Sequence, residues 1–320
     1  MRRFLLCIVT AIFLVLVGCE LFLEQNPLGS IHHVSVGLNY YGTNVKRLNG
    51  TLNDADELQA CLEDLGAETK REYHGYLMTQ RGTETSYDYD EANENFPTKD
   101  NILNKLTFLQ SVLGENDLTI FSYSGHGDYD GSLVLAPTET SLDGTGIILD
   151  IHEKVTDECS LGVEELLSKM ESLPGKKLLI LDSCYCGAFV EESNSSISLI
   201  EKNRCMQRAF ETYFSSSSST YDLFVLAATT SDNTSKEPVG DGHIHGYFSR
   251  ALLEGLGWNQ DTNTLKKYTH PAFTSGILSL DSLYAYIHTH QILATEGIYA
   301  PRYQHPTITG GALDLVIFRN

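Results

Sequence analysis

The feature that most constrains this fold is the repeated alternation of short apolar runs with helical patterns. Runs rich in apolar residues, without strict polar alternation, occur at 31–38, 118–123, 177–181 and 221–228. Between them apolar residues return every three or four positions, which predicts helices at 53–65, 101–113, 162–173 and 247–256. This order is typical of a mostly parallel sheet with helices on both faces. We therefore expect an α/β fold.

A helix at 281–293 and a strand at 313–318 are predicted to complete the chain. Two stretches lack a regular pattern. The first, 76–100, is rich in Tyr, Glu, Asp and Asn, and the second, 191–220, contains five consecutive serines. Both are predicted to be exposed or mobile loops.

The N-terminus has the pattern of an export signal. Two arginines precede the apolar run 4–17, which is too short to span a bilayer comfortably. The stretch Leu16-Val-Gly-Cys19 resembles the lipobox of bacterial lipoproteins, in which the cysteine is lipidated and becomes the first mature residue. We predict a signal peptide at 1–18, a tether at 19–30 and one domain at 31–320. The domain would be exported and anchored to a membrane through Cys19, on the periplasmic or cell-surface side; a retained apolar anchor is the alternative.

The net charge limits the classes of binding partner, and the cysteine count bears on unpaired thiols. The chain has 22 Lys and Arg against 42 Asp and Glu, a formal net charge of -20, and no basic cluster interrupts the acidity. Nucleic acid is therefore excluded as a partner, whereas basic substrates are favoured. Five cysteines follow Cys19, so an exported protein would leave at least one thiol unpaired.

Two consecutive central strands are followed by residues that can carry chemistry. Ser124-Gly-His-Gly127 follows the run at 118–123, and Asp182-Ser-Cys184 follows the run at 177–181. Ligands of parallel α/β sheets bind beyond the carboxyl ends of the strands, so His126 and Cys184 are expected at the same edge. An imidazole near a thiol favours the nucleophilic thiolate and can then protonate a departing amine.

These two segments resemble the paired motifs of the caspase-like cysteine peptidases, in particular the metacaspases. The resemblance covers about residues 31–257, including Phe224-Val-Leu-Ala-Ala-Thr-Thr230 and Gly246-Tyr-Phe-Ser-Arg-Ala-Leu252. It implies a caspase-like fold with a first part at 31–190, a loop at 191–220 and a second part at 221–320.

The resemblance also implies catalytic roles. His126 would be the general acid/base and Cys184 the nucleophile, in a cysteine endopeptidase that acts through an acyl-enzyme. The backbone N–H groups of Gly127 and Cys184 would form the oxyanion hole. No metal or other cofactor would be required for this chemistry.

Specificity for a basic side chain is a further implication. Metacaspases bind such a side chain with acidic residues, and the corresponding positions here are Asp182 and Asp54, with Ser124 and Thr51 lining the pocket. Two desolvated carboxylates suit a guanidinium or an ammonium, which predicts cleavage after Arg or Lys. The alternatives are structural: Asp182 could cap the turn after it, Asp54 could cap the first helix, and Ser124 could support the backbone.

Caspase-like enzymes are often cut after the nucleophile, and Lys202, Arg204 and Arg208 offer basic sites in the predicted loop. The alternative is that these cations offset neighbouring glutamates. Metacaspases commonly respond to calcium, but Asp128, Asp130, Asp143 and Asp150 are only nearby acids, so a calcium site is not mapped.

Three other functions are weighed against the peptidase. A caspase-like fold can serve as a binding scaffold, although retention of His126 and Cys184 argues against it. Cys184-Tyr-Cys186 hints at dithiol redox chemistry, but the usual spacing is C-x-x-C. The pairs His243-Ile-His245 and His288-Thr-His290 hint at metal binding, yet neither has a third ligand nearby in the sequence, so no metal site is predicted.

Overall fold

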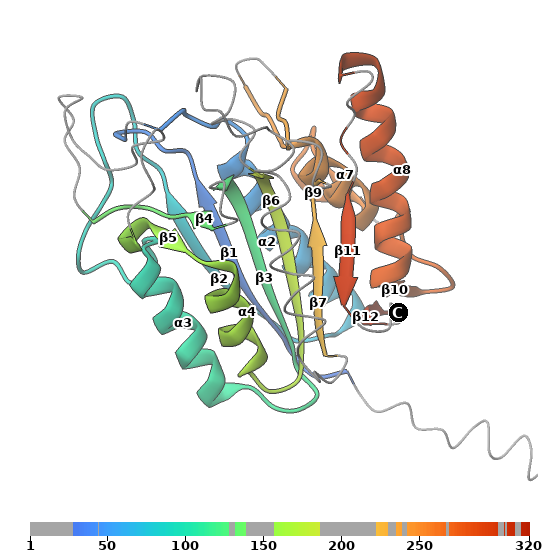
Figure 1. Cartoon of the computed structure of the whole chain (residues 1–320). Helices are drawn as coiled ribbons and strands as arrows, with labels where there is room; N and C mark the ends of the chain where they lie inside the picture. Colours follow the sequence, from blue (N-terminus) through green and yellow to red (C-terminus); the bar gives the residue numbers. More distant parts are fainter. Residues whose placement is uncertain are drawn as a thin grey trace, which may run out of the picture.

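The computed structural model describes residues 28–43, 45–127, 132–138, 157–185, 222–229, 235–238, 242–266, 269–299, 304, 306–310 and 315–320. Its centre is an eight-stranded sheet, shown in Figure 1. Six strands form the main path, in the order β11 (Thr307–Gly310), β7 (Leu223–Ala227), β6 (Lys176–Tyr185), β3 (Leu118–Gly127), β1 (Ile31–Leu38) and β2 (Tyr73–Gln80). All neighbours on this path are parallel except β11, which is antiparallel to β7.

Short elements complete the structure. β4 (Leu133–Val134) joins β3 to β5 (Ser160–Leu161), which follows the 3₁₀ turn Asp157–Cys159. Two small antiparallel pairs lie apart from the main sheet: β8 (Trp258–Asn259) with β9 (Thr264–Leu265), and β10 (Ile277–Ser279) with β12 (Val316–Arg319). The strand predicted at the C-terminal end of the chain is therefore present as β12, outside the main sheet.

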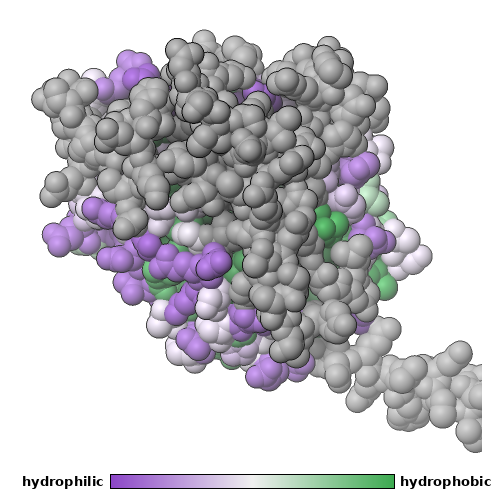
Figure 2. Space-filling view, viewed as in Figure 1, coloured by the Kyte–Doolittle hydropathy of each residue, from purple (hydrophilic) through white to green (hydrophobic). Residues whose placement is uncertain are grey.

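Helices cover both faces of the sheet, which confirms the predicted α/β class. One face packs against α3 (Lys99–Val112) and α4 (Val163–Glu171). The other packs against α2 (Thr51–Thr69), α7 (Tyr247–Leu256) and α8 (Leu280–Tyr299). Figure 2 shows hydrophilic side chains predominating over the region of α3 and α4, where the described surface is visible. Among the described residues, no helix combines the length and apolarity that a bilayer span requires.

The two-residue period of the strands separates two cores. Along β3, Phe121 and Tyr123 pack toward α3 and α4, whereas Leu118 and Ile120 pack toward α2 and α7. The same alternation continues beyond the apolar run, so Ser122, Ser124 and His126 follow Ile120 on the α2 and α7 face. The sheet thus turns from an apolar core into a line of polar residues near its carboxyl edge.

The predicted boundaries differ from the structure at β2, β3 and β6, and a fourth strand was missed. The predicted loop 76–100 contains most of β2, because this edge strand is only partly buried and its polar composition looks like that of a loop. β11 was not predicted at all. β3 and β6 each continue four residues past their apolar runs, because residues 124–127 and 182–185 stay paired in register. The predicted site residues therefore lie within the last paired positions of β3 and β6 and not after them: Ser124, His126, Asp182 and Cys184.

A buried histidine on β1 makes stability depend on pH. His33 is fully buried, and its ring nitrogens hydrogen-bond the hydroxyls of Tyr73 at 2.9 Å and Ser122 at 2.7 Å. Burial lowers the pKa of His33 from 6.5 to about 3. Below pH 6.5 the unfolded chain binds a proton here that the folded protein does not. The stability contributed by neutral His33 is therefore present above pH 6.5 and is lost as the pH falls toward 3.

Replacing His33 with glutamine should weaken this dependence. Between pH 7 and pH 5, His33→Gln is expected to lose about 2 kcal/mol less free energy of unfolding than the wild type. Urea denaturation at the two pH values measures the difference. His74→Gln, which changes a partly exposed histidine on the neighbouring strand β2, is the control. Identical losses in wild type and His33→Gln would contradict this account.

Candidate active site

The register of β3 against β6 brings the two predicted catalytic positions together. His126 pairs with Cys184, and Ser124 pairs with Asp182, in a parallel ladder. Paired positions of neighbouring parallel strands share a face of the sheet, about 5 Å apart. His126 and Cys184 are thus neighbours across the two strands, on the face of the sheet that also carries Ser124 and Asp182. The Cys184 side chain lies outside the described part of the structure.

His126 is held in one orientation. It is fully buried, and its Nε2 lies 2.7 Å from the backbone carbonyl oxygen of Lys46, in the loop after β1. A carbonyl oxygen only accepts, so Nε2 carries the hydrogen and, in the neutral ring, Nδ1 carries the lone pair. Burial is the main cause that lowers the pKa of His126 to about 4. The ring is therefore neutral at pH 7 and can accept a proton at Nδ1.

Two tyrosines fix the backbone at His126. The His126 N–H donates to the Tyr40 hydroxyl at 2.8 Å, and the Tyr123 hydroxyl donates to the His126 carbonyl oxygen at 2.7 Å. A Cβ at Gly125 would lie 2.5 Å from the Tyr123 hydroxyl and 2.6 Å from that of Tyr40. The glycine before His126 is thus required by these tyrosines, a reason that the motif alone does not reveal. Gly127, the predicted oxyanion donor, is the last residue of β3 and pairs with Tyr185.

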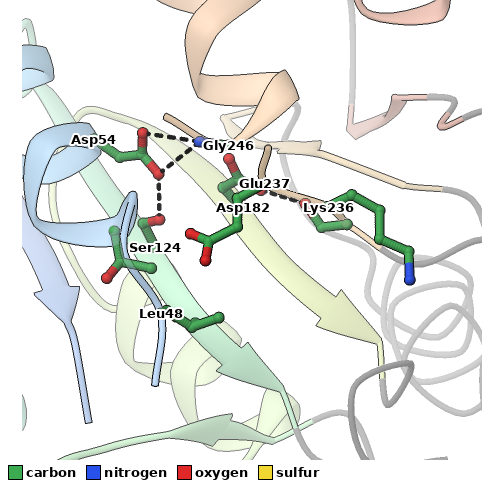
Figure 3. Close-up of a pocket in the computed structure, with 10 residues that line it drawn as sticks. Leu48, Asp54, Ser124, Asp182, Lys236, Glu237 and Gly246 are labelled. Carbon is green, nitrogen blue, oxygen red and sulfur yellow. Dashed lines mark hydrogen bonds between the residues drawn. The ribbon is translucent and has the colours of Figure 1, made fainter. Parts of the chain in front are cut away.

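A pocket lies beside this pair, at the junction of α2, β3, β6 and the segment before α7. It is small and open to solvent, with a cavity volume of about 40 Å³. Figure 3 shows Asp54 from α2, Ser124 from β3, Asp182 from β6 and the Gly246 backbone converging on it. All four predicted pocket residues line it, including Thr51, whose hydroxyl donates to the Leu38 carbonyl oxygen at 2.6 Å.

Asp54 joins three elements. Its carboxylate accepts hydrogen bonds from the Ser124 hydroxyl at 2.7 Å, from His245 Nδ1 at 2.9 Å and from the Gly246 N–H at 3.3 Å. It does not cap α2, because the N-cap residue is Gly50 and has no side-chain cap. Burial raises the pKa of Asp54 to about 6, against the opposing effect of His245. Burial alone would lower the pKa of His245, but the nearby carboxylates of Asp54 and Glu57 outweigh this and raise it to about 9.

Asp182 is held by hydroxyl and backbone donors. Ser235 Oγ donates to it at 2.5 Å, and Ser249 donates through Oγ at 2.6 Å and through its backbone N–H at 3.2 Å. Ser249 lies in the first turn of α7, so Asp182 accepts hydrogen bonds from the start of a distant helix. The turn after β6, which Asp182 could cap, lies outside the described residues. Burial raises the pKa of Asp182. A Cβ at Gly246 would overlap this carboxylate, so only glycine fits there.

No lysine or arginine of the described chain neutralises these two carboxylates. Their partners are serine hydroxyls, backbone N–H groups and His245. Lys236 lines the pocket, but Figure 3 shows its side chain running away from both carboxylates. Two buried carboxylates therefore lie beside an open pocket, and of the two only Asp54 has an ion-pair partner among the described residues, His245.

Comparison with known proteins assigns the family. The family model described as the caspase domain matches residues 34–272, about three quarters of the chain. The chain belongs to the caspase domain family.

Within this family the similarity to individual relatives is distant. The caspase domain here is 26% identical to Metacaspase-1 of Plasmodium falciparum, over 54% of this chain and 27% of the relative. It is 28% identical to Metacaspase-1 of Schizosaccharomyces pombe, over 49% of this chain and 34% of the relative. The matches thus span well under half of these relatives. The solved structure of protein GSU0716 from Geobacter sulfurreducens aligns with a TM-score of 0.49 and 15% identity, covering 88% of this chain and 93% of its own, a likeness too low to add to the assignment.

The caspase domain uses residues in its pocket that the sequence did not single out. Glu237 lines the pocket and accepts from the backbone N–H groups of Asn49 and Gly50, which holds the start of α2 in place. Ser235 and Ser249 bind Asp182. No local sequence pattern marks these three residues, because their hydrogen-bond partners lie 53 to 188 positions away in the sequence.

Several predicted sites lie outside the described residues. These are the lipidation site Cys19, the processing sites Lys202, Arg204 and Arg208, the second thiol of the redox alternative, Cys186, and the acids weighed for calcium, Asp128, Asp130, Asp143 and Asp150. They stay predictions. Cys61 and Cys159 are described, and both side chains are buried.

Proposed function

We propose that this caspase domain is a cysteine endopeptidase that cleaves after arginine or lysine. The family supports a cysteine-type peptidase. The single observation that carries the proposal is the pairing of His126 with Cys184 in neighbouring strands, with the His126 ring fixed by the Lys46 carbonyl.

The fixed tautomer defines the proposed proton path. Nδ1 of neutral His126 takes the proton of the Cys184 thiol as the sulfur attacks the scissile carbonyl. The resulting imidazolium then gives this proton to the departing amine, which leaves an acyl-enzyme on Cys184. Water then attacks the acyl carbonyl carbon as Nδ1 takes one of its protons. The C–S bond breaks, the acid product leaves, and the imidazolium returns the proton to the Cys184 sulfur. Backbone N–H groups of Gly127 and Cys184 are the proposed donors to the developing oxyanion.

The pocket supports specificity for a basic side chain. Ser124 and Asp182 precede His126 and Cys184 by two positions on the same strands, and two strand residues span about 7 Å. Asp182 is thus separated from the proposed nucleophile Cys184 by about the length of an arginine or lysine side chain. A guanidinium or ammonium entering the pocket would meet Asp182, whose described hydrogen-bond donors are uncharged, and Asp54, which also bonds His245.

Fluorogenic peptides that differ only at the cleaved position test this proposal. We expect turnover of the Arg and Lys peptides at least about 10³-fold above that of the Asp peptide, because an acidic side chain would meet two buried carboxylates. Each peptide should be tested with and without calcium, since calcium dependence is not assigned. Faster cleavage after Asp than after Arg would overturn the specificity. Turnover of none of the peptides under either condition would count against the activity itself.

A further inference from the structure

Glu57, His243 and His245 form a cluster outside the proposed catalytic pair. Glu57 lies on α2, and the two histidines lie in the segment that leads into α7. One ligand atom of each side chain lies within 4.8 Å of the others. The fold therefore supplies the third ligand that His243-Ile-His245 lacks in the sequence. Asn53, one turn before Glu57, donates to the Ile244 carbonyl oxygen at 2.8 Å and holds the segment against the helix.

Two buried atoms of this cluster have no hydrogen bond. His245 is 3% exposed and Glu57 is 6% exposed. Within the described chain, His245 Nε2 and Glu57 Oε1 lack a hydrogen-bond partner. They are nevertheless close to the cluster: Nε2 lies 3.3 Å from Glu57 Oε2, and His243 Nε2 contacts Oε1. Neither contact meets the geometry of a hydrogen bond, so a ligand that satisfies both buried atoms would be stabilising.

The opposite ends of the same side chains are already held. His245 Nδ1 and Asp54 Oδ1 are 2.9 Å apart, with the nitrogen donating, which leaves Nε2 facing the cluster. Trp258 Nε1 donates to Glu57 Oε2 at 2.6 Å, which leaves Oε1 facing the cluster. A histidine supported by a carboxylate, and a carboxylate supported by an N–H donor, are the usual outer contacts of metal ligands.

We propose that Glu57 Oε1, His243 Nε2 and His245 Nε2 bind a divalent transition-metal ion of the zinc class. Two imidazoles and one carboxylate are a donor set that zinc binds with a further position open to water. Imidazole nitrogen is a poor ligand for calcium or magnesium, which take oxygen. The His243 side chain is 38% exposed, so the open position lies toward solvent.

The proposed metal site lies next to the pocket, but none of its three ligands lines the pocket. Asp54 binds His245 on one side and Ser124 on the other. A bound ion would join α2 to the segment that carries Gly246. Binding needs neither a peptide nor the thiol of Cys184, so it stands or falls separately from the proposed peptidase activity.

Metal titration of the full chain tests this site. Calorimetry with Zn²⁺ and visible absorption of Co²⁺ should be measured in a Cys184→Ala background, so that the proposed catalytic thiol supplies no ligand. We expect one ion per chain. His243→Ala and Glu57→Gln should each weaken Zn²⁺ binding at least about tenfold, and the absorption of low-coordinate Co²⁺ should be lost. His74→Ala, which removes another partly exposed histidine paired with a glutamate, is the matched control and should bind normally.

Thermal unfolding separates ligand loss from misfolding. His243 is exposed, so His243→Ala should unfold in chelator at nearly the wild-type temperature and should lose only the stabilisation that Zn²⁺ adds. Absence of a one-to-one zinc complex in the parent protein would overturn the proposal. So would a complex of unchanged affinity in a folded His243→Ala variant.

Discussion

Replacing Cys184 with alanine is expected to reduce peptide turnover by at least about 10⁴-fold, because the proposed acyl-enzyme has no other attacking atom. The fold should survive, since the backbone pairing of β6 with β3 does not depend on the thiol. His126→Ala should cause a comparable loss. The double variant should lose little more than either single one, because the two side chains act in one step.

Cys186→Ala is the matched control for this result. It removes a thiol two positions away and should retain turnover, whereas a dithiol redox protein would need both thiols. Values of kcat/KM for the four variants, with circular dichroism to verify folding, measure the effect. Undiminished turnover in Cys184→Ala, or an equal loss in Cys186→Ala, would exclude the proposed nucleophile.

The second large effect concerns the charge of Asp182. Asp182→Asn is expected to reduce kcat/KM for an Arg peptide on the order of 10²-fold, because the guanidinium loses a charge-assisted partner in a buried pocket. Asparagine has nearly the same shape, and it can still accept from Ser249 and donate to Ser235. The substitution therefore removes the charge and keeps the packing.

A citrulline peptide isolates the charge pairing. Citrulline replaces the guanidinium with a neutral group of the same shape, so its slow turnover should change by less than about fivefold on Asp182→Asn. The quantity to determine is the coupling between Asp182→Asn and the replacement of Arg by citrulline in the peptide, taken from the four kcat/KM values. Asp56→Asn, which alters a partly exposed α2 carboxylate paired with Arg81, should leave both peptides unaffected. Equal losses for the Arg and citrulline peptides would mean that Asp182 acts through structure and not through charge.

The central strands could be predicted because their residues are apolar on both faces. β1, β3 and β7 are buried along their whole length, and β6 is buried over 177–183, and burial of that kind leaves a clear pattern in the sequence. β2 and the short antiparallel β11 are edge strands. Their composition has to satisfy solvent as well as the core, so periodicity did not reveal them.

The proposed site was predictable where it continues the apolar runs of β3 and β6. His126, Cys184, Ser124 and Asp182 come directly after the apolar runs, and a parallel register brings them to one edge. Asp54 was found through family resemblance. The contacts that decide its environment, with His245 and Gly246, cross 191 positions or more and depend on how α7 packs against α2. No local pattern encodes that packing, which is also why Glu57 was not recognised as a partner of His243 and His245.

Labelling with an active-site-directed probe tests directly whether Cys184 is the nucleophile of a site that prefers arginine. A peptide with Arg at the cleaved position and a thiol-reactive carbonyl group, followed by mass spectrometry of the digested protein, identifies the modified residue. The account predicts one label per chain, on Cys184, with loss of labelling in His126→Ala and strong slowing in Asp182→Asn. The Asp-containing probe should react far more slowly. Labelling at another cysteine, or at Cys184 with equal rates for the Arg and Asp probes, would contradict the account.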